Sequence, residues 1–533
     1  MNSKSMYIAI IIGSVALVIV ATVIVFMVLL GGQGEYIPYP AQDETFYTAE
    51  TPTPETNNND ESARPDDEYE TTMYSEDDDT EDEPDGLEPT IPVAISDGPI
   101  RWHIHPNWNF HQVFNFSEGM AAVEYFEDGF WESMHILGYI NRIGEIVIPV
   151  EHRHYPEMYA YRGAPPFSEG LVAIRSEENG AMGVFDTQGN QIVPFEAEFA
   201  FGWNFQEGLM AVRQGGWEQM PDGDWSDQSR WGFIDSTGRT AIPLEFQHAE
   251  NFRDGLAAVM QAGYWGFINT DGEVVIDFII NVATDDGHGF LIIPSFSEGL
   301  VAVSTGGWEQ DENDRWFDTT TWGFMNREGN QVIPFDFTNA GRFSGGVAPV
   351  MIGHHNSQDE DGNWYSSARW GVIDQAGNTV VPFEYTWIGN FVEGVAIAFP
   401  VDGDGVVLLD RSGTVIVPSG RYTNIHDFSE GLAAVRAAYT NGGEPAWGFI
   451  NRHGYSVINP RFNFVGAFSE GFAPVSIGGW EDVNGERINN ERWGFIDREG
   501  NVVVPIEFHE VRAFSEGLAW VRQGDLWGLL EIR

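Results

Sequence analysis

Repeated glutamates are the first candidates for chemistry in this sequence. A Phe-Ser-Glu-Gly-like motif occurs ten times between Phe116 and Gly517, and eight copies carry the acid: Glu118, Glu169, Glu207, Glu298, Glu393, Glu430, Glu470 and Glu516. A carboxylate can act as a general base or a nucleophile, but ten near-identical positions cannot all form one active site. A glutamate between Ser and Gly is more typical of a turn, where it satisfies backbone donors. We therefore predict that these glutamates are structural and that the chain has no catalytic residue.

Three tryptophans stand apart from this motif, in long and acidic connections. The pattern Gly-Gly-Trp-Glu places them at Trp217, Trp308 and Trp480. An exposed aromatic ring flanked by carboxylates suits a sugar or a peptide, because the ring stacks while the acid accepts from hydroxyl or amine groups. The alternative is that each ring covers the base of its own hairpin. We take these three residues as the candidate ligand-binding residues.

Four acidic stretches have the oxygen-rich spacing that calcium accepts: Asp222 to Asp224, Asp311 to Asp314, Asp359 to Asn363 and Asp402 to Gly405. None matches the full twelve-residue calcium loop, and Asp-Gly is also a common tight-turn pair. The 13 histidines show no metal-binding helix motif. No nucleophile elbow, phosphate loop or dinucleotide fingerprint appears. The sequence therefore predicts no metal, no cofactor and no enzyme activity.

The repeated motif belongs to a longer unit of three short strands. Phe514 to Arg522, Trp493 to Asp497 and Asn501 to Pro505 are each rich in β-branched or aromatic residues and bounded by glycine, which predicts strands. An Asp/Asn-x-x-Gly turn, as at Asp497 to Gly500, separates the second strand from the third. Its Asx side chain can bond the backbone two residues on, and its glycine supplies a positive φ. The unit therefore predicts an antiparallel hairpin. Its third strand ends in proline in eight copies and in Asp277 in another, which marks a strand end or edge.

Ten copies at spacings of 37 to 51 residues predict an all-β fold of ten tandem repeats, since such periods mark propellers, solenoids and arrays. The connection between the first and second strands varies most in length, which predicts hairpin tips on one face. The last copy stops at Leu530 to Arg533, before its third strand, and Trp102 to Phe110 has the spacing of that missing strand. An N-terminal strand in that place would close a propeller-like ring, although an open β spiral would give the same strand count.

The N-terminal region predicts a membrane anchor. Residues 7–30 carry no charge, and this length exceeds the roughly 20 residues that a transmembrane helix needs. Lys4 precedes the run and Glu35 is the first acid after it, so residues 1–6 are expected in the cytoplasm and the rest outside the cell. A cleaved signal peptide is the alternative, but the apolar run is long for one. We expect a retained signal-anchor, a single-pass topology and a place in the cell membrane.

Residues 31–98 predict an acidic, disordered stalk, because they hold little apolar surface and repel one another. The repeat domain then spans 99–533. The net charge of −55 argues against nucleic acid as a partner, since phosphate contacts need clustered basic residues. The chain has no cysteine, so no disulfide or lipid-modified cysteine is available to it.

The paired motif of Phe-Ser-Glu-Gly-Leu-Ala and Trp-Gly-Phe-Ile-Asp-x-x-Gly, followed by Val-Ile-Pro, resembles the bacterial WG-repeat family, also called the KWG-repeat family. Trp265-Gly266, Trp370-Gly371 and Trp493-Gly494 are clean examples, whereas Leu137-Gly138 departs from the pattern. The resemblance covers about residues 101 to 533. It implies β-rich repeats and no established activity.

These observations favour a membrane-anchored extracellular repeat scaffold for binding or protein interaction, with an unknown protein or glycan ligand. Two alternatives stay open. One is a surface hydrolase that cleaves glycans through a carboxylate pair. The other is a passive spacing protein without any ligand.

Overall fold

The computed structural model describes residues 93–95, 98–126, 135–154, 164–176, 181–195, 199, 201–202, 204–220, 225–280, 294–310, 316–354, 357–358, 364–401, 403, 405–437, 446–483 and 486–533. The predicted membrane span and nearly all of the predicted stalk lie outside these residues. In the part of the chain that is described, no helix is long and apolar enough to cross a membrane.

Every regular element of the described residues is a β-strand. The strands of the N-terminal half are β1 (Ile100–Trp108), β2 (Gln112–Val113), β3 (Met120–Phe126), β4 (His135–Asn141), β5 (Ile146–His154), β6 (Leu171–Arg175), β7 (Met182–Asp186), β8 (Gln191–Val193), β9 (Phe201–Gly202), β10 (Leu209–Gln214), β11 (Trp217–Gln219), β12 (Trp225–Asp227), β13 (Arg230–Asp235), β14 (Thr240–Phe246), β15 (His248–Ala249), β16 (Leu256–Gln261), β17 (Tyr264–Asn269), β18 (Val274–Ile280), β19 (Leu300–Thr305), β20 (Trp308–Gln310), β21 (Trp316–Asp318), β22 (Thr321–Asn326) and β23 (Gln331–Phe337).

The strands of the C-terminal half are β24 (Asn339–Ala340), β25 (Val347–Ile352), β26 (Ser357–Gln358), β27 (Trp364–Tyr365), β28 (Arg369–Asp374), β29 (Thr379–Ile388), β30 (Val395–Pro400), β31 (Val407–Asp410), β32 (Val415–Val417), β33 (Tyr422–Ser429), β34 (Leu432–Ala437), β35 (Trp447–Asn451), β36 (Ser456–Phe462), β37 (Phe464–Val465), β38 (Ala473–Ile477), β39 (Trp480–Val483), β40 (Glu486–Asn489), β41 (Arg492–Ile496), β42 (Val502–Phe508), β43 (Glu510–Val511), β44 (Leu518–Gln523) and β45 (Leu526–Ile532). The prediction of an all-β fold of short antiparallel strands is confirmed.

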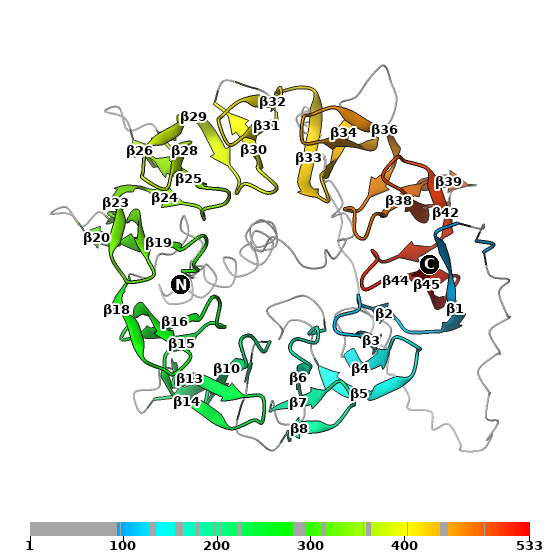
Figure 1. Cartoon of the computed structure of the whole chain (residues 1–533), viewed down its shortest axis with the longest axis horizontal. Coiled ribbons are helices and arrows are strands. Elements are labelled where there is room, and N and C mark those ends of the chain that lie inside the picture. Colours follow the sequence, from blue (N-terminus) through cyan, green and yellow to red (C-terminus); the bar gives the residue numbers. More distant parts are fainter. Residues whose placement is uncertain are drawn as a thin grey trace, which may run out of the picture. The chain divides into compact units, whose positions relative to one another are not determined.

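The described strands form nine sheets of three or more strands and four two-stranded hairpins. The sheet of order β15-β16-β17-β18 shows the common plan: a two-residue strand, then the three strands predicted for each repeat, all antiparallel. One sheet is longer, because β29 continues from the outer position of one repeat into the first position of the next and joins seven strands. Within residues 93–533 the sheets follow one another around a ring, with strands such as β14 and β18 at its rim (Figure 1).

The Asx turns between the second and third strands have the predicted geometry. Asn269 Oδ1 accepts from Asp271 N at 3.1 Å and from Glu273 N at 2.9 Å, and Gly272 has φ 81°. The same two acceptor bonds recur at the Asx residues of eight other repeats: Asn141, Asp186, Asp235, Asn326, Asp374, Asp410, Asn451 and Asp497. The turn chemistry is local, which is why sequence alone predicts it.

The N-terminal strand completes the last sheet, as the strand count predicted. β1 pairs antiparallel with β45, with Ile100 opposite Ile532 and Trp108 opposite Trp527, in a sheet of order β1-β45-β44-β43. Figure 1 shows this as the blue β1 beside the red β45. Trp527 Nε1 also donates to Phe110 O at 3.0 Å. The described residues therefore form a closed ring and not an open spiral.

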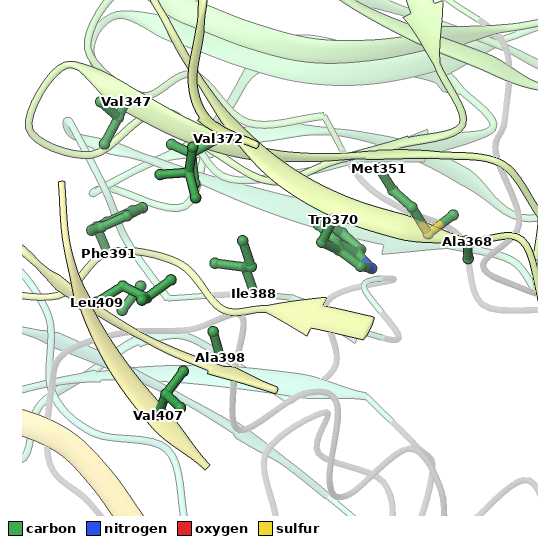
Figure 2. Packing of buried hydrophobic residues seen from close by; sticks show 12 residues of the cluster. Val347, Met351, Ala368, Trp370, Val372, Ile388, Phe391, Ala398, Val407 and Leu409 are labelled. Atoms are coloured by element: carbon green, nitrogen blue, oxygen red, sulfur yellow. The ribbon is translucent and has the colours of Figure 1, made fainter. Parts of the chain in front are cut away.

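The core lies between successive repeats. In one cluster Val347, Met351 and Trp370 come from β25 and β28, whereas Ala398 and Leu409 come from β30 and β31 of the next repeat. Figure 2 shows Trp370 beside Met351 and Ala368 in this cluster. Other clusters combine neighbouring sheets in the same way, as where Trp265 of β17 packs with Phe296 and Val301. A single repeat cannot bury its apolar faces alone, so stacking of neighbours stabilises the ring.

Candidate functional site

Each Phe-Ser-Glu-Gly motif is a tight two-residue turn. Ser515 N donates to Leu518 O at 2.8 Å, and Leu518 N donates back to Ser515 O at 3.1 Å. The two central residues both have positive φ, 54° for Glu516 and 78° for Gly517, which is the pattern of a type I′ turn. For an L-residue this left-handed conformation costs roughly 1–2 kcal/mol. All eight glutamates of the motif adopt it, so something else must favour Glu at this position.

The carboxylate of each turn binds the backbone of the next turn. Glu118 accepts from Glu169 N at 2.8 Å and from Gly170 N at 2.6 Å, and Glu298 accepts from Gly345 N and Gly346 N in the same way. The remaining six glutamates each accept from the glycine of the following motif. The glutamates do satisfy backbone donors, as predicted. The donors belong to the neighbouring repeat, however, and not to the glutamate's own turn.

The serine of the motif makes a second bond in the same direction. Ser117 Oγ donates to Phe167 O at 2.8 Å, and Ser168 Oγ donates to Phe205 O at 2.6 Å. The other serines of the motif do the same: Ser297, Ser344, Ser429, Ser469 and Ser515. We call this pair of bonds, from the Ser hydroxyl and to the Glu carboxylate, the clasp between two repeats.

The clasp continues across the two ends of the repeat domain. Glu516 accepts from Gly119 N at 2.8 Å, and Ser515 Oγ donates to Phe116 O at 2.6 Å. The last motif is therefore joined to the first by the same two bonds that join consecutive motifs. The backbone pairing of β1 and the clasp are independent contacts, and both close the ring.

Two motifs lack the glutamate. Gly345 stands at one of these positions, where the Arg411 guanidinium donates to Gly345 O at 3.2 Å. A Cβ on Gly345 would lie 2.5 Å from Arg411 Cζ, so the arginine fills the space of the missing side chain. At the other position Arg253 and Asp254 replace Ser and Glu, and neither clasp bond forms in the described residues.

Arginines from the Asx turns neutralise some of the clasp carboxylates. Arg452 lies 2.7 Å from Glu393, and Arg142 lies 3.5 Å from Glu516. These pairs are partly exposed and contribute little stability by themselves. Because every clasp carboxylate accepts from backbone N–H groups of the next repeat, the motif joins one repeat to the next.

The four long connections between first and second strands fold into hairpins, at the point predicted for variable tips. They are β11/β12, β20/β21, β26/β27 and β39/β40. Trp217, Trp308 and Trp480 each begin the first strand of a hairpin and pair with Asp227, Asp318 and Asn489. Their side chains lie outside the described part of the structure. Whether the rings are exposed or cover the hairpin base thus stays a prediction.

Cross-strand pairing reveals a second tryptophan that sequence reasoning missed. Three hairpins place a glutamine directly opposite a tryptophan at the far end of the strands: Gln219 with Trp225, Gln310 with Trp316, and Gln358 with Trp364. In each case five residues separate the two, and this constant spacing is the signal that would have identified the pair. Like those of Trp217, Trp308 and Trp480, the side chains of these six residues lie outside the described part of the structure, and the backbone pairing is what recurs. The same residue pair therefore recurs at three places on the ring.

Three of the four acidic stretches considered for calcium fall in the connections that carry these hairpins, and the fourth, Asp402 to Gly405, falls between β30 and β31. All four lie outside the described residues or reach only partly into them. Among the residues that the structure does place, no group of three His, Asp or Glu side chains could hold a metal ion.

Two acid–histidine pairs are covered by the fold. Glu124 and His135, on neighbouring strands, are buried, with Oε2 and Nδ1 2.8 Å apart. His248 and Glu250 lie 3.7 Å apart, with His248 stacked on Trp231 and in an edge-to-face arrangement with Trp265. Burial raises the pKa of Glu250 to about 7 and lowers the pKa of His248 to about 4. The carboxylate-pair mechanism of glycan cleavage uses two carboxyl groups that face each other. Each of these pairs contains one carboxyl group and one imidazole.

The repeated Trp-Gly pairs are explained by the third strand. A Cβ on Gly266 would lie 2.8 Å from Ile276 O, and a Cβ on Gly232 would lie 2.6 Å from Pro243 O. Only glycine lets the outer strand approach this closely, and that strand is bulged at the same place. The tryptophan before it is buried, with 0% exposure at Trp265 and 5% at Trp231.

This sequence pattern matches a family described as WG containing repeat, over residues 182–216, 231–265, 265–307, 322–353, 370–399, 408–437, 447–479 and 493–527. The chain belongs to the WG-repeat family. The matched segments run from the second strand of one repeat to the first strand of the next, so a WG repeat in this chain spans the junction that the clasp and the core stabilise. The predicted family is confirmed for this WG-repeat protein.

Comparison with other proteins gives little further information on this WG-repeat protein. None of the curated proteins matches it. Among solved structures, it is similar to the eukaryotic initiation factor with 12% identity and TM-score 0.41, over 76% of this chain and 98% of that one. The β-propeller domain of the Trilobed protease from Pyrococcus furiosus gives 10% identity and TM-score 0.27, over 63% and 91%. Kluyveromyces lactis Hsv2p gives 13% and 0.24, over 64% and 97%. These likenesses are too weak to bear on function.

Proposed function

We propose that this protein is a membrane-anchored extracellular scaffold, a ring of ten WG repeats that binds a glycan through its hairpins. The uncharged run at residues 7–30 supports the anchor, and the acidic residues 31–98 support a spacer that keeps the ring away from the membrane. The clasp and the shared core support a rigid frame, which holds the hairpins at fixed separations.

The observation that carries this proposal is the repeated Gln–Trp pair of the hairpins. Gln219 opposite Trp225, Gln310 opposite Trp316 and Gln358 opposite Trp364 occupy the same position on three hairpins. An aromatic face packs on the C–H surface of a sugar ring, while an amide both donates to and accepts from hydroxyl groups. A polysaccharide repeats its own units, so several equal sites on one frame would bind it with avidity.

Glycan-array binding by the full-length chain in detergent tests this function. The wild type should bind a defined set of polysaccharides, and the triple variant Trp225→Ala, Trp316→Ala, Trp364→Ala should lose that binding while its thermal unfolding stays unchanged. Ser226→Ala is the matched control, because Ser226 pairs with Glu218 on the other face of the first hairpin. Binding to peptides but to no glycan, or binding that survives the triple variant, would refute the proposed ligand class.

A further inference from the structure

Proline protects the outer edge of almost every sheet in this ring. The outer strands carry it within or directly after the strand: Pro106, Pro149, Pro194, Pro243, Pro334, Pro382, Pro418, Pro460 and Pro505. An edge strand offers unpaired N–H and C=O groups to other chains, and proline removes one donor and blocks such pairing. The strand β18 is the exception, because Asp277 stands at the proline position.

A second protective feature is missing from the same strand. Two residues after the proline, the neighbouring rim strands carry an exposed acid, Glu245 in β14 and Asp336 in β23. Charged side chains on an edge also discourage pairing with other strands. In β18 this position is Ile279, which is 59% exposed.

The outward side of β18 is apolar except for one carboxylate. Val275 is 39% exposed and Ile279 59%, whereas Ile276 and Ile280 between and beside them are 1% and 2% exposed and belong to the core. Alternate residues of a strand share a face, and the burial pattern of β18 keeps this alternation through its bulge. The exposed face of β18 therefore consists of Val275, Asp277 and Ile279, with the acid between two apolar side chains.

We propose that β18 is a docking edge to which an extended segment of a partner protein adds as a further strand. This mode of binding takes its affinity from backbone hydrogen bonds and its specificity from alternate side chains. The face of β18 calls for a partner strand that alternates apolar, basic and apolar residues, because a basic side chain opposite Asp277 is the favourable cross-strand pair. The net charge of −55 also favours a basic partner.

A second copy of this chain fits the edge poorly. If two β18 strands paired antiparallel with Val275 opposite Ile279, each Asp277 would lie opposite its own copy. Like charges directly opposite one another are destabilising, and two bodies of this acidity repel one another. The edge is thus built for a different chain.

The test uses the full-length chain in detergent and a labelled peptide, Thr-Val-Thr-Arg-Thr-Val-Thr, which presents Val, Arg and Val on one face. Fluorescence anisotropy should show binding, and hydrogen exchange at residues 275–279 should slow when the peptide is added. A peptide with Glu in place of Arg should bind at least about tenfold more weakly. The double variant Asp277→Pro, Ile279→Glu gives β18 the two residue types that β14 has at Pro243 and Glu245, so it should fold and lose binding.

Asp336→Glu on β23 is the control that should change nothing, and thermal unfolding midpoints should agree among all variants. Absence of peptide binding to the wild type, or equal binding by the double variant, would overturn the proposal. Sedimentation velocity covers the other occupant: a dimer of the wild type that the double variant abolishes would assign the edge to a second copy and refute the peptide assignment. Glycan binding by the hairpins should be unaffected in every variant.

Discussion

Glu516 and Gly119 are 397 residues apart in sequence and are joined by a hydrogen bond of 2.8 Å from the glycine N–H to the carboxylate. The bond is the same one that links Glu470 to Gly517 within the chain, also at 2.8 Å. The seam where the ends of the repeat domain meet is therefore built like an ordinary junction between repeats.

Because the two hydrogen bonds are alike, weakening either one should lower the free energy of unfolding by a similar amount. Glu516→Gln and Glu470→Gln should each lower the free energy of unfolding by about 1–2 kcal/mol, because a hydrogen bond to a charged acceptor becomes a neutral one. Urea unfolding of the full-length chain measures both. Glu507→Gln, an exposed acid on β42, is the control and should be neutral. A marked loss at Glu470 with none at Glu516 would show that the ring is open in solution.

Deletion of residues 99–110 removes β1 and tests the closure from its backbone side. Because β1 pairs with β45, the deletion should expose the edge of β45 and increase hydrogen exchange at Leu526–Ile532. Exchange in a distant sheet, such as β15 to β18, should change much less, since each repeat contacts only its neighbours. Unchanged protection of β45 would contradict the closed ring.

The two kinds of tryptophan should separate stability from binding. Trp265 is fully buried, so Trp265→Ala should destabilise the protein by about 3–5 kcal/mol through the cavity it leaves. Trp480, at the start of a hairpin, should affect the unfolding midpoint little when replaced by Ala and should weaken ligand binding. Trp493 lies between these cases, because it is only partly buried against the core. Differential scanning calorimetry on the three variants ranks them, and equal losses for Trp265→Ala and Trp480→Ala would remove the distinction.

Glu250 should make stability depend on pH in a direction opposite to that of most carboxylates. Its pKa is raised to about 7 by burial, so between its unfolded pKa near 4.5 and 7 the folded state holds more protons than the unfolded state. The stability from this group is complete at low pH and is lost as the pH rises through about 7. His248, with a pKa lowered to about 4, contributes the reverse slope between 4 and 6.5 and masks part of the effect.

The variant Glu250→Gln isolates the carboxyl contribution. Relative to wild type, it should gain stability as the pH rises from 4.5 to 7, by on the order of 2 kcal/mol after allowing for solvent screening of the partly exposed group. Denaturant unfolding at several pH values gives the difference curve. A flat difference would mean that Glu250 titrates normally in the folded protein.

Local chemistry explains which features of the fold the sequence could predict. In the Asx turn, Asn269 Oδ1 accepts from residues only two and four positions away, so the residue types of this short segment predict the turn. The strand at Trp102 to Phe110 could be predicted by counting the strands of each repeat, because the last repeat lacks its own third strand. The clasp could not be predicted in the same way, because Glu118 reaches Gly170, 52 residues on, and only the stacking of repeats brings the two together. The Gln–Trp pairs of the hairpins could be predicted only by comparing the spacing in three connections, because the sequence of a single strand does not contain its register.

The junction that lacks both clasp bonds, at Arg253 and Asp254, should be the least stable junction of the ring. Every other junction in the described residues keeps at least one of its two bonds, including the seam between the chain ends. The junction between the sheets of β18 and β19 keeps neither, so the apolar cluster that includes Trp265 and Phe296 is the contact that remains there. Backbone hydrogen exchange should therefore be faster at this junction than at the other junctions, while β1 and β45, which carry the two ends of the repeat domain, stay paired in one sheet.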